Sequence, residues 1–314
     1  MDIKQSIVIF GGNSVLAQNF LKNYSNQTDI TKITRLNKSE NDISCDMGKF
    51  LYQKELSTLI NQIRSRLIYD RTVFVLFSWC GGPRTNNNVE EVLNINRNIV
   101  SNFIGVCKKI NPSKIVFLSS AGTLYPDDNR LKNYNELDIV SPKTFYGKQK
   151  FMAENMISNY ALENNLKFTI LRIASAYGYD KRFSDQGVIN KWLYSAIENK
   201  SLKLFNSIDS VVNFISFKQI SDAIYLSLIN SLDGIYNIGT EKSISLNEVI
   251  DQISQVTKKK LELDIIRNDK RFFNIDISKF CKITGTKFKL KLEDDIKIIY
   301  QTILKDRNID TKFF

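Results

Sequence analysis

The chain has 314 residues, of which 43% are hydrophobic and 25% charged, so it has the composition of a globular protein of roughly two domains. It contains no histidine, which excludes Ser-His-Asp and Cys-His catalysis and imidazole metal sites, and we expect no metal. The net charge of +11 comes from Lys and Arg spread along the chain without a nucleic-acid motif, so no nucleic-acid partner is expected. The scattered cysteines and the lack of a long apolar stretch favour a cytoplasmic protein with no membrane partner.

Short β-branched runs alternate with longer amphipathic stretches in the first half of the chain. Strands are expected at 7–10, near 32–35, and at 72–77, 114–118 and 168–173, with helices at 15–24, 89–109 and 150–164. This alternation predicts an α/β fold with a doubly wound parallel sheet of the Rossmann type. The pattern becomes irregular further on, so we predict a first domain over 1–177 and a smaller mixed C-terminal lobe over 178–314, with 211–240 returning to the first domain.

Two glycines follow the first expected strand and precede the first expected helix. Backbone N–H groups at such a helix start bind phosphate, and glycine lets the phosphate approach closely. On the pattern G-x-x-G-x-x-G, however, only the first of the three key positions, Gly11, Ser14 and Ala17, is glycine. Two interpretations therefore stay open, an ordinary turn or a dinucleotide site. In the second, the pyrophosphate is bound by Gly11, Gly12, Ser14, Val15 and Leu16.

The residue that distinguishes NADP from NAD is expected at the end of the second strand. Arg35 lies there, 24 positions after Gly11, where an acidic residue would bind a ribose 2′-hydroxyl. Arginine can pair with a 2′-phosphate instead, so the position favours NADP, with NAD as the alternative. A surface arginine without this role is the other interpretation. Asp46, after the third strand, is placed to meet the adenine edge.

A Tyr-x-x-x-Lys sequence opens the helix that follows the strand at 114–118. Tyr146 and Lys150 are four residues apart and so share a helix face. A neighbouring ammonium is expected to lower the tyrosine pKa from about 10 and make the phenol a usable acid or base. Upstream, hydroxyl residues from Ser119 to Thr123 end the strand and could bind a substrate oxygen. Trp79, after the strand at 72–77, either faces the nicotinamide or packs in the core.

This ordered set resembles the extended short-chain dehydrogenase/reductases, in particular their sugar-nucleotide epimerase, dehydratase and reductase family. The resemblance covers nearly the whole chain and is carried by residues 141–154, 171–178 and 234–250. It implies that the first domain binds NAD(P) and the second the substrate. It also implies that Tyr146 is the acid/base, and that Lys150 assists it and binds the cofactor ribose. Because Ala121 stands where the family often has its catalytic hydroxyl, Ser120 or Thr123 would serve.

Several positions depart from the family pattern. Ser175 stands where the family usually has a substrate-contacting Asn, and 212–216 replaces a segment that often carries an Arg-Asp pair and a His. Arg271 could supply the missing contact to the substrate diphosphate, or it could belong to a solvated basic cluster. The resemblance implies a nucleotide-sugar substrate and leaves room for a homodimer.

These differences from the family pattern also reduce the number of candidate reactions. A 4,6-dehydratase would need an acidic pair where this chain has Ala121 and Gly122, and a 3,5-epimerase/reductase of the GDP-fucose synthase type would use a histidine. The favoured activity is an NADPH-dependent 4-ketoreductase of a 4-keto-6-deoxy sugar nucleotide. The alternative is an NAD-dependent 4-epimerase. A non-catalytic NAD(P)-binding regulator ranks below both, since such proteins commonly lose the tyrosine or the lysine.

Overall fold

The computed structural model describes residues 5–27, 29–36, 42–83, 88–126, 132–183, 187–230 and 232–308. The chain divides into two compact units. The first unit consists of Met1–Pro126, Ile139–Arg172 and Ser221–Tyr236. The second consists of Asp127–Asp138, Ile173–Ile220 and Asn237–Phe314.

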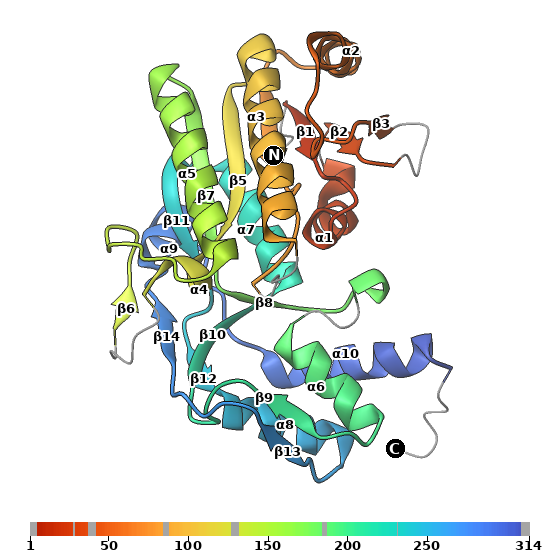
Figure 1. Cartoon of the computed structure of the whole chain (residues 1–314), viewed down its shortest axis with the longest axis vertical. Helices are drawn as coiled ribbons and strands as arrows, with labels where there is room; N and C mark the ends of the chain where they lie inside the picture. Colours follow the sequence, from red (N-terminus) through yellow and green to blue (C-terminus); the bar gives the residue numbers. More distant parts are fainter. Residues whose placement is uncertain are drawn as a thin grey trace. The chain divides into compact units, whose positions relative to one another are not determined.

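A seven-stranded sheet in the order β11-β7-β5-β4-β1-β2-β3 forms the centre of the first unit (Figure 1). Its strands are β1 (Ser6–Phe10), β2 (Asp29–Thr34), β3 (Asp42–Ser44), β4 (Thr72–Leu76), β5 (Lys114–Ser120), β7 (Lys167–Ile173) and β11 (Gly234–Ile238). The pairs β1–β2, β1–β4, β2–β3 and β4–β5 are all parallel. Their carboxyl ends therefore meet at one edge of the sheet, the place where open α/β sheets bind ligands.

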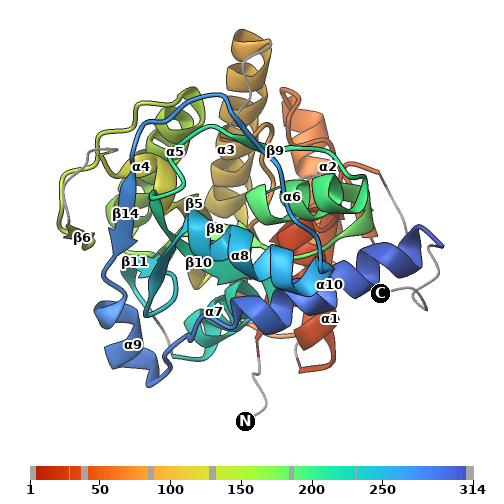
Figure 2. The ribbon, with the colours of Figure 1, turned by 90° about the horizontal axis from the view of Figure 1, so that it is seen from below.

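Helices cover both faces of this sheet. They are α1 (Val15–Tyr24), α2 (Gln53–Arg64), α3 (Val89–Ile110), α4 (Ala121–Leu124), α5 (Phe145–Glu163) and α7 (Phe217–Ile229). The helices α2, α3 and α5 lie on one side, and α1 and α7 on the other (Figure 2). The rings of Tyr24 and Tyr225 stack at 4.3 Å between α1 and α7. Because both faces are covered, every residue of β1 and β4 is buried.

The second unit contains mixed strands and a helical cluster. Its strands are β6 (Asn133–Tyr134), β8 (Ser175–Tyr177), β9 (Leu202–Leu204), β10 (Val211–Ser216), β12 (Ser243–Ser245), β13 (Leu263–Ile265) and β14 (Phe272–Ile275). Its helices are α6 (Val188–Ile197), α8 (Leu246–Thr257), α9 (Ser278–Thr284) and α10 (Leu292–Asp306). Strand β10 pairs antiparallel with β12 and parallel with β14 and β8. Apolar side chains of α6, α8 and α10 form the core beside these strands.

The expected α/β class with a doubly wound parallel sheet is confirmed, and the second unit contains a further mixed sheet. The strand β3 is the third strand that was assumed before Asp46 without a range, and the helix α2 was not expected from the sequence. Helix α5 begins five residues earlier than the expected range 150–164, because the Thr144 hydroxyl caps it by accepting the N–H of Gly147 at 3.0 Å. Of the segment 211–240, β10 lies in the second unit and β11 joins the seven-stranded sheet. Among the described residues, none of the helices is both long and apolar enough to cross a bilayer.

Candidate active site

The turn between β1 and α1 requires glycine at its first position. Gly11 has φ of +89°, and a Cβ there would lie 2.5 Å from the backbone nitrogen of Ser78. The N–H groups of Gly11 and Gly12 both donate to the carbonyl of Ile33, at 2.9 and 3.1 Å. These bonds tie the turn to β2. The two glycines thus allow close backbone approach, while their N–H groups are used within the protein.

The backbone N–H groups suited to a phosphate group belong to the residues after this turn, at the start of α1. Ser14 caps α1, since its hydroxyl accepts the N–H of Ala17 at 3.3 Å. The N–H groups of Val15 and Leu16, in the first turn of α1, have no acceptor in the described part of the chain. Two such donors at the positive end of a ten-residue helix fit a phosphate group. The turn therefore fits the pyrophosphate of a dinucleotide.

Arg35 and Asp46 lie at the same carboxyl edge of the sheet. Arg35 is exposed directly after β2. Asp46 is half-buried after β3, and its Oδ1 accepts the N–H of Gly48 at 3.1 Å. Burial raises the pKa of the Cys80 thiol in the loop after β4, Glu91 adds to this rise and Arg35 opposes it. Arg35 is therefore close enough to this loop to act on it electrostatically.

The side chains of Tyr146 and Lys150 share one face of α5, as their spacing predicts. The Lys150 Nζ lies 5.7 Å from the centroid of the Tyr146 ring and donates to the carbonyl of Leu118 at 2.8 Å. Lys150 is only 5% exposed, and Tyr146 is half-buried in the first turn of the helix. The end of β5 and the start of α5 therefore hold the pair together.

The expectation that the ammonium lowers the tyrosine pKa is wrong for this structure. Burial raises the pKa of Tyr146 well above its usual value. Burial also lowers the pKa of Lys150 to about 7, and Glu154 opposes that decrease. Apolar surroundings disfavour the charged form of each group. At neutral pH the phenol therefore keeps its proton, and the amine is divided between its two protonation states.

Two of the hydroxyl groups expected at the strand end lie together. Thr123 Oγ1 donates to Ser120 Oγ at 3.0 Å, in the turn where β5 passes into α4. The Ser119 hydroxyl is buried and has no hydrogen-bond partner among the described residues. A Cβ at Gly147 would lie 2.3 Å from the carbonyl oxygen of Thr123. The start of α5, next to Tyr146, thus packs directly against the turn that carries the hydroxyls.

Two buried networks that support the site were not predicted. Asn96 holds Cys80 by accepting its N–H at 2.9 Å and donating to its carbonyl at 3.1 Å, and it also donates to Gln149. Arg172 and Glu154 form a buried ion pair at 2.8 Å. The only sequence signals were an arginine inside an apolar strand and a glutamate one helical turn after a lysine. Neither signal identifies its partner.

The two predicted substrate residues lie in the second unit. Ser175 is half-buried on β8, opposite Phe214 of β10. Arg271 precedes β14, and its carbonyl accepts the N–H of Val211 at 2.8 Å. Its guanidinium lies 5.5 Å from the centroid of the Phe273 ring. The two residues therefore adjoin opposite ends of β10.

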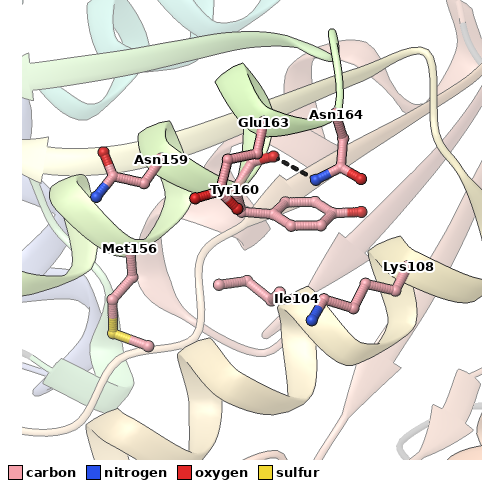
Figure 3. Close-up of a pocket in the computed structure, with 7 residues that line it drawn as sticks. All are labelled: Ile104, Lys108, Met156, Asn159, Tyr160, Glu163 and Asn164. Atoms are coloured by element: carbon pink, nitrogen blue, oxygen red, sulfur yellow. Dashed lines mark hydrogen bonds between the residues drawn. The ribbon is translucent and has the colours of Figure 1, made fainter.

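A groove on the outer surface of α3 and α5 contains none of the predicted site residues (Figure 3). It has a volume of about 520 Å³ and includes Ile104, Lys108, Met156 and Tyr160. The Asn164 amide donates to the carbonyl of Tyr160 at 2.8 Å. The groove is lined by none of the glycine-turn, Tyr-Lys or strand-end hydroxyl residues, so we place the candidate active site at the carboxyl edge of the sheet.

Comparison with known proteins gives matches over most of the chain. The model of the NAD dependent epimerase/dehydratase family matches residues 7–239. The dTDP-4-dehydro-6-deoxyglucose reductase of Escherichia coli is 30% identical over 195 residues, covering 60% of this chain and 61% of the relative. A putative UDP-glucose 4-epimerase of Methanocaldococcus jannaschii is 30% identical over 154 residues, covering 48% and 50%. The chain thus spans about half to three fifths of the length of these relatives.

A solved structure shares the fold at lower identity. The UDP-glucuronic acid 4-epimerase of Bacillus cereus, in complex with UDP-glucuronic acid and NAD, superposes with a TM-score of 0.81 at 16% identity. The superposition covers 96% of this chain and 99% of that one. Since the family match extends over well more than half of the sequence, the chain belongs to the NAD-dependent epimerase/dehydratase family, a family of sugar-nucleotide enzymes.

Proposed function

We propose that this chain catalyses the NADPH-dependent reduction of the C4 ketone of a 4-keto-6-deoxy nucleotide sugar. The observation that carries the proposal is the Tyr146–Lys150 pair, whose lysine is buried, against the Ser120–Thr123 hydroxyls. Ketone reduction consumes one proton. Burial raises the pKa of Tyr146, so the phenol holds that proton at neutral pH.

In this proposal each group has one task. A bound nicotinamide dinucleotide would supply the hydride chemistry, and the protein would supply position and a proton. Tyr146 would donate its phenolic proton to the ketone oxygen, and with a hydride added to the carbon the C=O group would become CH–OH. Lys150, with a pKa of about 7, can return a proton to the phenolate. The hydroxyls of Ser120 and Thr123 hydrogen-bond the substrate oxygen and keep it in line with Tyr146.

The cofactor proposal rests on residues around the β1–α1 turn. Val15 and Leu16 would bind the pyrophosphate through their N–H groups, with Gly11, Gly12 and Ser14 shaping the turn. Arg35, exposed at the end of β2, would pair with the 2′-phosphate of NADP. Asp46 would accept from the adenine edge. In the second unit, Ser175 and Arg271 would bind the sugar and its diphosphate.

A second candidate is NAD-dependent C4 epimerisation. The same tyrosine, lysine and hydroxyls would suffice for oxidation, rotation of the sugar and re-reduction. Two comparisons favour it: the Methanocaldococcus jannaschii relative carries an epimerase name, and the Bacillus cereus 4-epimerase binds NAD. The similarity to the Escherichia coli reductase and the exposed Arg35 support the reductase instead.

The experiment uses two portions of the purified protein. One portion is denatured to identify any released nucleotide, and the folded second portion is titrated with NADPH and NADH by calorimetry to measure the two affinities. A reductase exchanges its cofactor at each turnover, so we expect little bound nucleotide and tighter binding of NADPH. Stoichiometric NAD that leaves only on denaturation would contradict the proposal and favour the epimerase.

A further inference from the structure

The indole ring of Trp79 covers the ammonium group of Lys150. Trp79 lies in the loop after β4, and the Lys150 Nζ is 3.9 Å from its ring centroid. We propose that Trp79 is a positioning residue for Lys150. The face of its indole ring holds the Lys150 ammonium group between the end of β5 and the start of α5. This inference rests on the proposed function, in which Lys150 serves Tyr146.

Two more aromatic rings complete the enclosure. The Phe117 ring centroid lies 4.8 Å from Nζ, and the Tyr146 centroid lies 5.7 Å away. The Leu118 carbonyl accepts a hydrogen bond from Nζ at 2.8 Å. Aromatic faces carry negative potential and attract a cation, most strongly for tryptophan. The rings and the carbonyl thus replace the water that would otherwise solvate the ammonium group.

Trp79 is itself held in place and touches both members of the pair. Its ring packs edge-to-face on Tyr146, with centroids 6.5 Å apart at 84°, and lies 6.0 Å from the Phe117 centroid. The backbone of the next residue, Cys80, is fixed on both its N–H and its carbonyl by Asn96. These contacts hold the Trp79 ring beside Lys150.

The enclosure acts on the charge of Lys150 in two opposing ways. Burial lowers its pKa to about 7, and the negative charge of Glu154 on α5 opposes this. The indole face also favours the ammonium form, because a cation gains from the ring quadrupole and a neutral amine does not. Among the described residues, the titratable group Tyr146 also faces Lys150, and its own burial keeps it protonated.

Substitution of Trp79 can separate its two effects on Lys150, which are burial by an apolar side chain and attraction of the cation by the ring face. Trp79→Leu keeps an apolar side chain over Lys150 but removes the ring face. It should decrease the ratio of ammonium to amine at a given pH about fivefold. Trp79→Phe keeps a ring face, so the ratio of ammonium to amine of Lys150 in this variant should stay within about twofold of the wild-type ratio.

The measurement is an NMR pH titration of protein labelled with ¹³C at the lysine Cε. Lys114 provides an internal control, because burial also lowers its pKa to about 7 and its Nζ donates to the carbonyl of Ser227. Lys150→Met and Lys114→Met assign the two signals. We expect Trp79→Leu to move the Lys150 midpoint to lower pH and to leave Lys114 unchanged.

An unchanged Lys150 midpoint in Trp79→Leu would overturn the proposal. If this variant moves Lys114 as well, Trp79→Met replaces it, since a flexible thioether fills the same space. Trp79→Met should then lower the Lys150 midpoint in the same way, and an unchanged Lys150 midpoint in this variant would overturn the proposal. The titration needs no turnover. A chain that shows the shift but reduces no nucleotide sugar would therefore refute only the proposed function.

Discussion

The backbone of Gly147 lies so close to the carbonyl oxygen of Thr123 that a Cβ at position 147 would approach that oxygen to 2.3 Å. This contact joins the first turn of α5, which carries Tyr146, to the turn that carries Ser120 and Thr123. The absence of a side chain at one position thus sets the distance between the acid and the hydroxyls in the proposed site.

Gly147→Ala should therefore separate the two halves of the site. The added methyl group must displace backbone, so we expect a loss of about 1–3 kcal/mol in the free energy of unfolding. We also expect a decrease of at least about 10-fold in kcat, because misplacement on the ångström scale is costly. Urea denaturation and steady-state kinetics measure the two effects. The control is Gly82→Ala, since a Cβ at Gly82 has no atom within 4 Å. Equal behaviour of the two variants would contradict this account.

Tyr146→Phe removes the proposed proton donor and leaves the ring that packs against Trp79. We expect kcat to decrease by about 10²–10⁴, while the dinucleotide affinity measured by calorimetry stays within a few-fold. Tyr160→Phe, which lies further along the same helix in the groove between α3 and α5, is the matched control and should retain activity. Near-wild-type turnover by Tyr146→Phe would exclude the tyrosine as the acid.

Arg35→Asp replaces the proposed partner of the 2′-phosphate with a group that repels it and can bind a ribose hydroxyl. The ratio of Kd values for NADPH and NADH should shift by about 10-fold or more toward NADH. Arg71→Asp makes the same charge change at the opposite edge of the sheet, directly before β4, and should leave the ratio unchanged. If the wild-type chain already binds NADH more tightly than NADPH, the role assigned to Arg35 is wrong.

Lys114 should make stability depend on pH. Its pKa is about 7 in the folded chain, lowered by burial, against about 10.4 when unfolded. Between these values the unfolded chain binds more protons, so the free energy of unfolding rises with pH by up to about 1.4 kcal/mol per unit. Below pH 7 the cost of burying the ammonium is present in full.

The test compares the wild type with Lys114→Met by urea denaturation from pH 6 to pH 10. The stability of the wild type should rise relative to the variant over this window. Lys148→Met, which changes an exposed lysine of α5, is the control and should follow the wild type. Parallel curves for the wild type and Lys114→Met would mean that Lys114 is not titrating near pH 7.

The sequence predicted the parallel sheet because its strands are apolar runs long enough to stand out, such as 72–77 and 114–118. It gave no range for the third strand, β3, because its three residues carry too little pattern. Its apolar pattern placed the start of α5 too late, at residue 150, because the stretch before Lys150 has no apolar periodicity and the helix begins through the Thr144 cap. The Tyr146–Lys150 spacing, by contrast, already required a helix from Tyr146.

At the site, the sequence identified the chemically distinctive residues but not their environment. The spacing of Tyr146 and Lys150 follows from helix geometry alone. The direction of the tyrosine pKa shift depends on burial among side chains from other elements, which no local pattern encodes. For the same reason the sequence allowed two positions for Trp79, in the core or facing the cofactor, and did not predict its contact with Lys150.

The most direct test of the central claim is to incubate the enzyme with nucleotide hexoses and their 4-keto-6-deoxy derivatives, following NADPH absorbance and the configuration of the product at C4. We predict that one 4-keto substrate is converted to a single C4 alcohol with consumption of one NADPH per product, and that Tyr146→Phe abolishes this conversion. Interconversion of C4 epimers without net consumption of cofactor would contradict the claim and identify an epimerase.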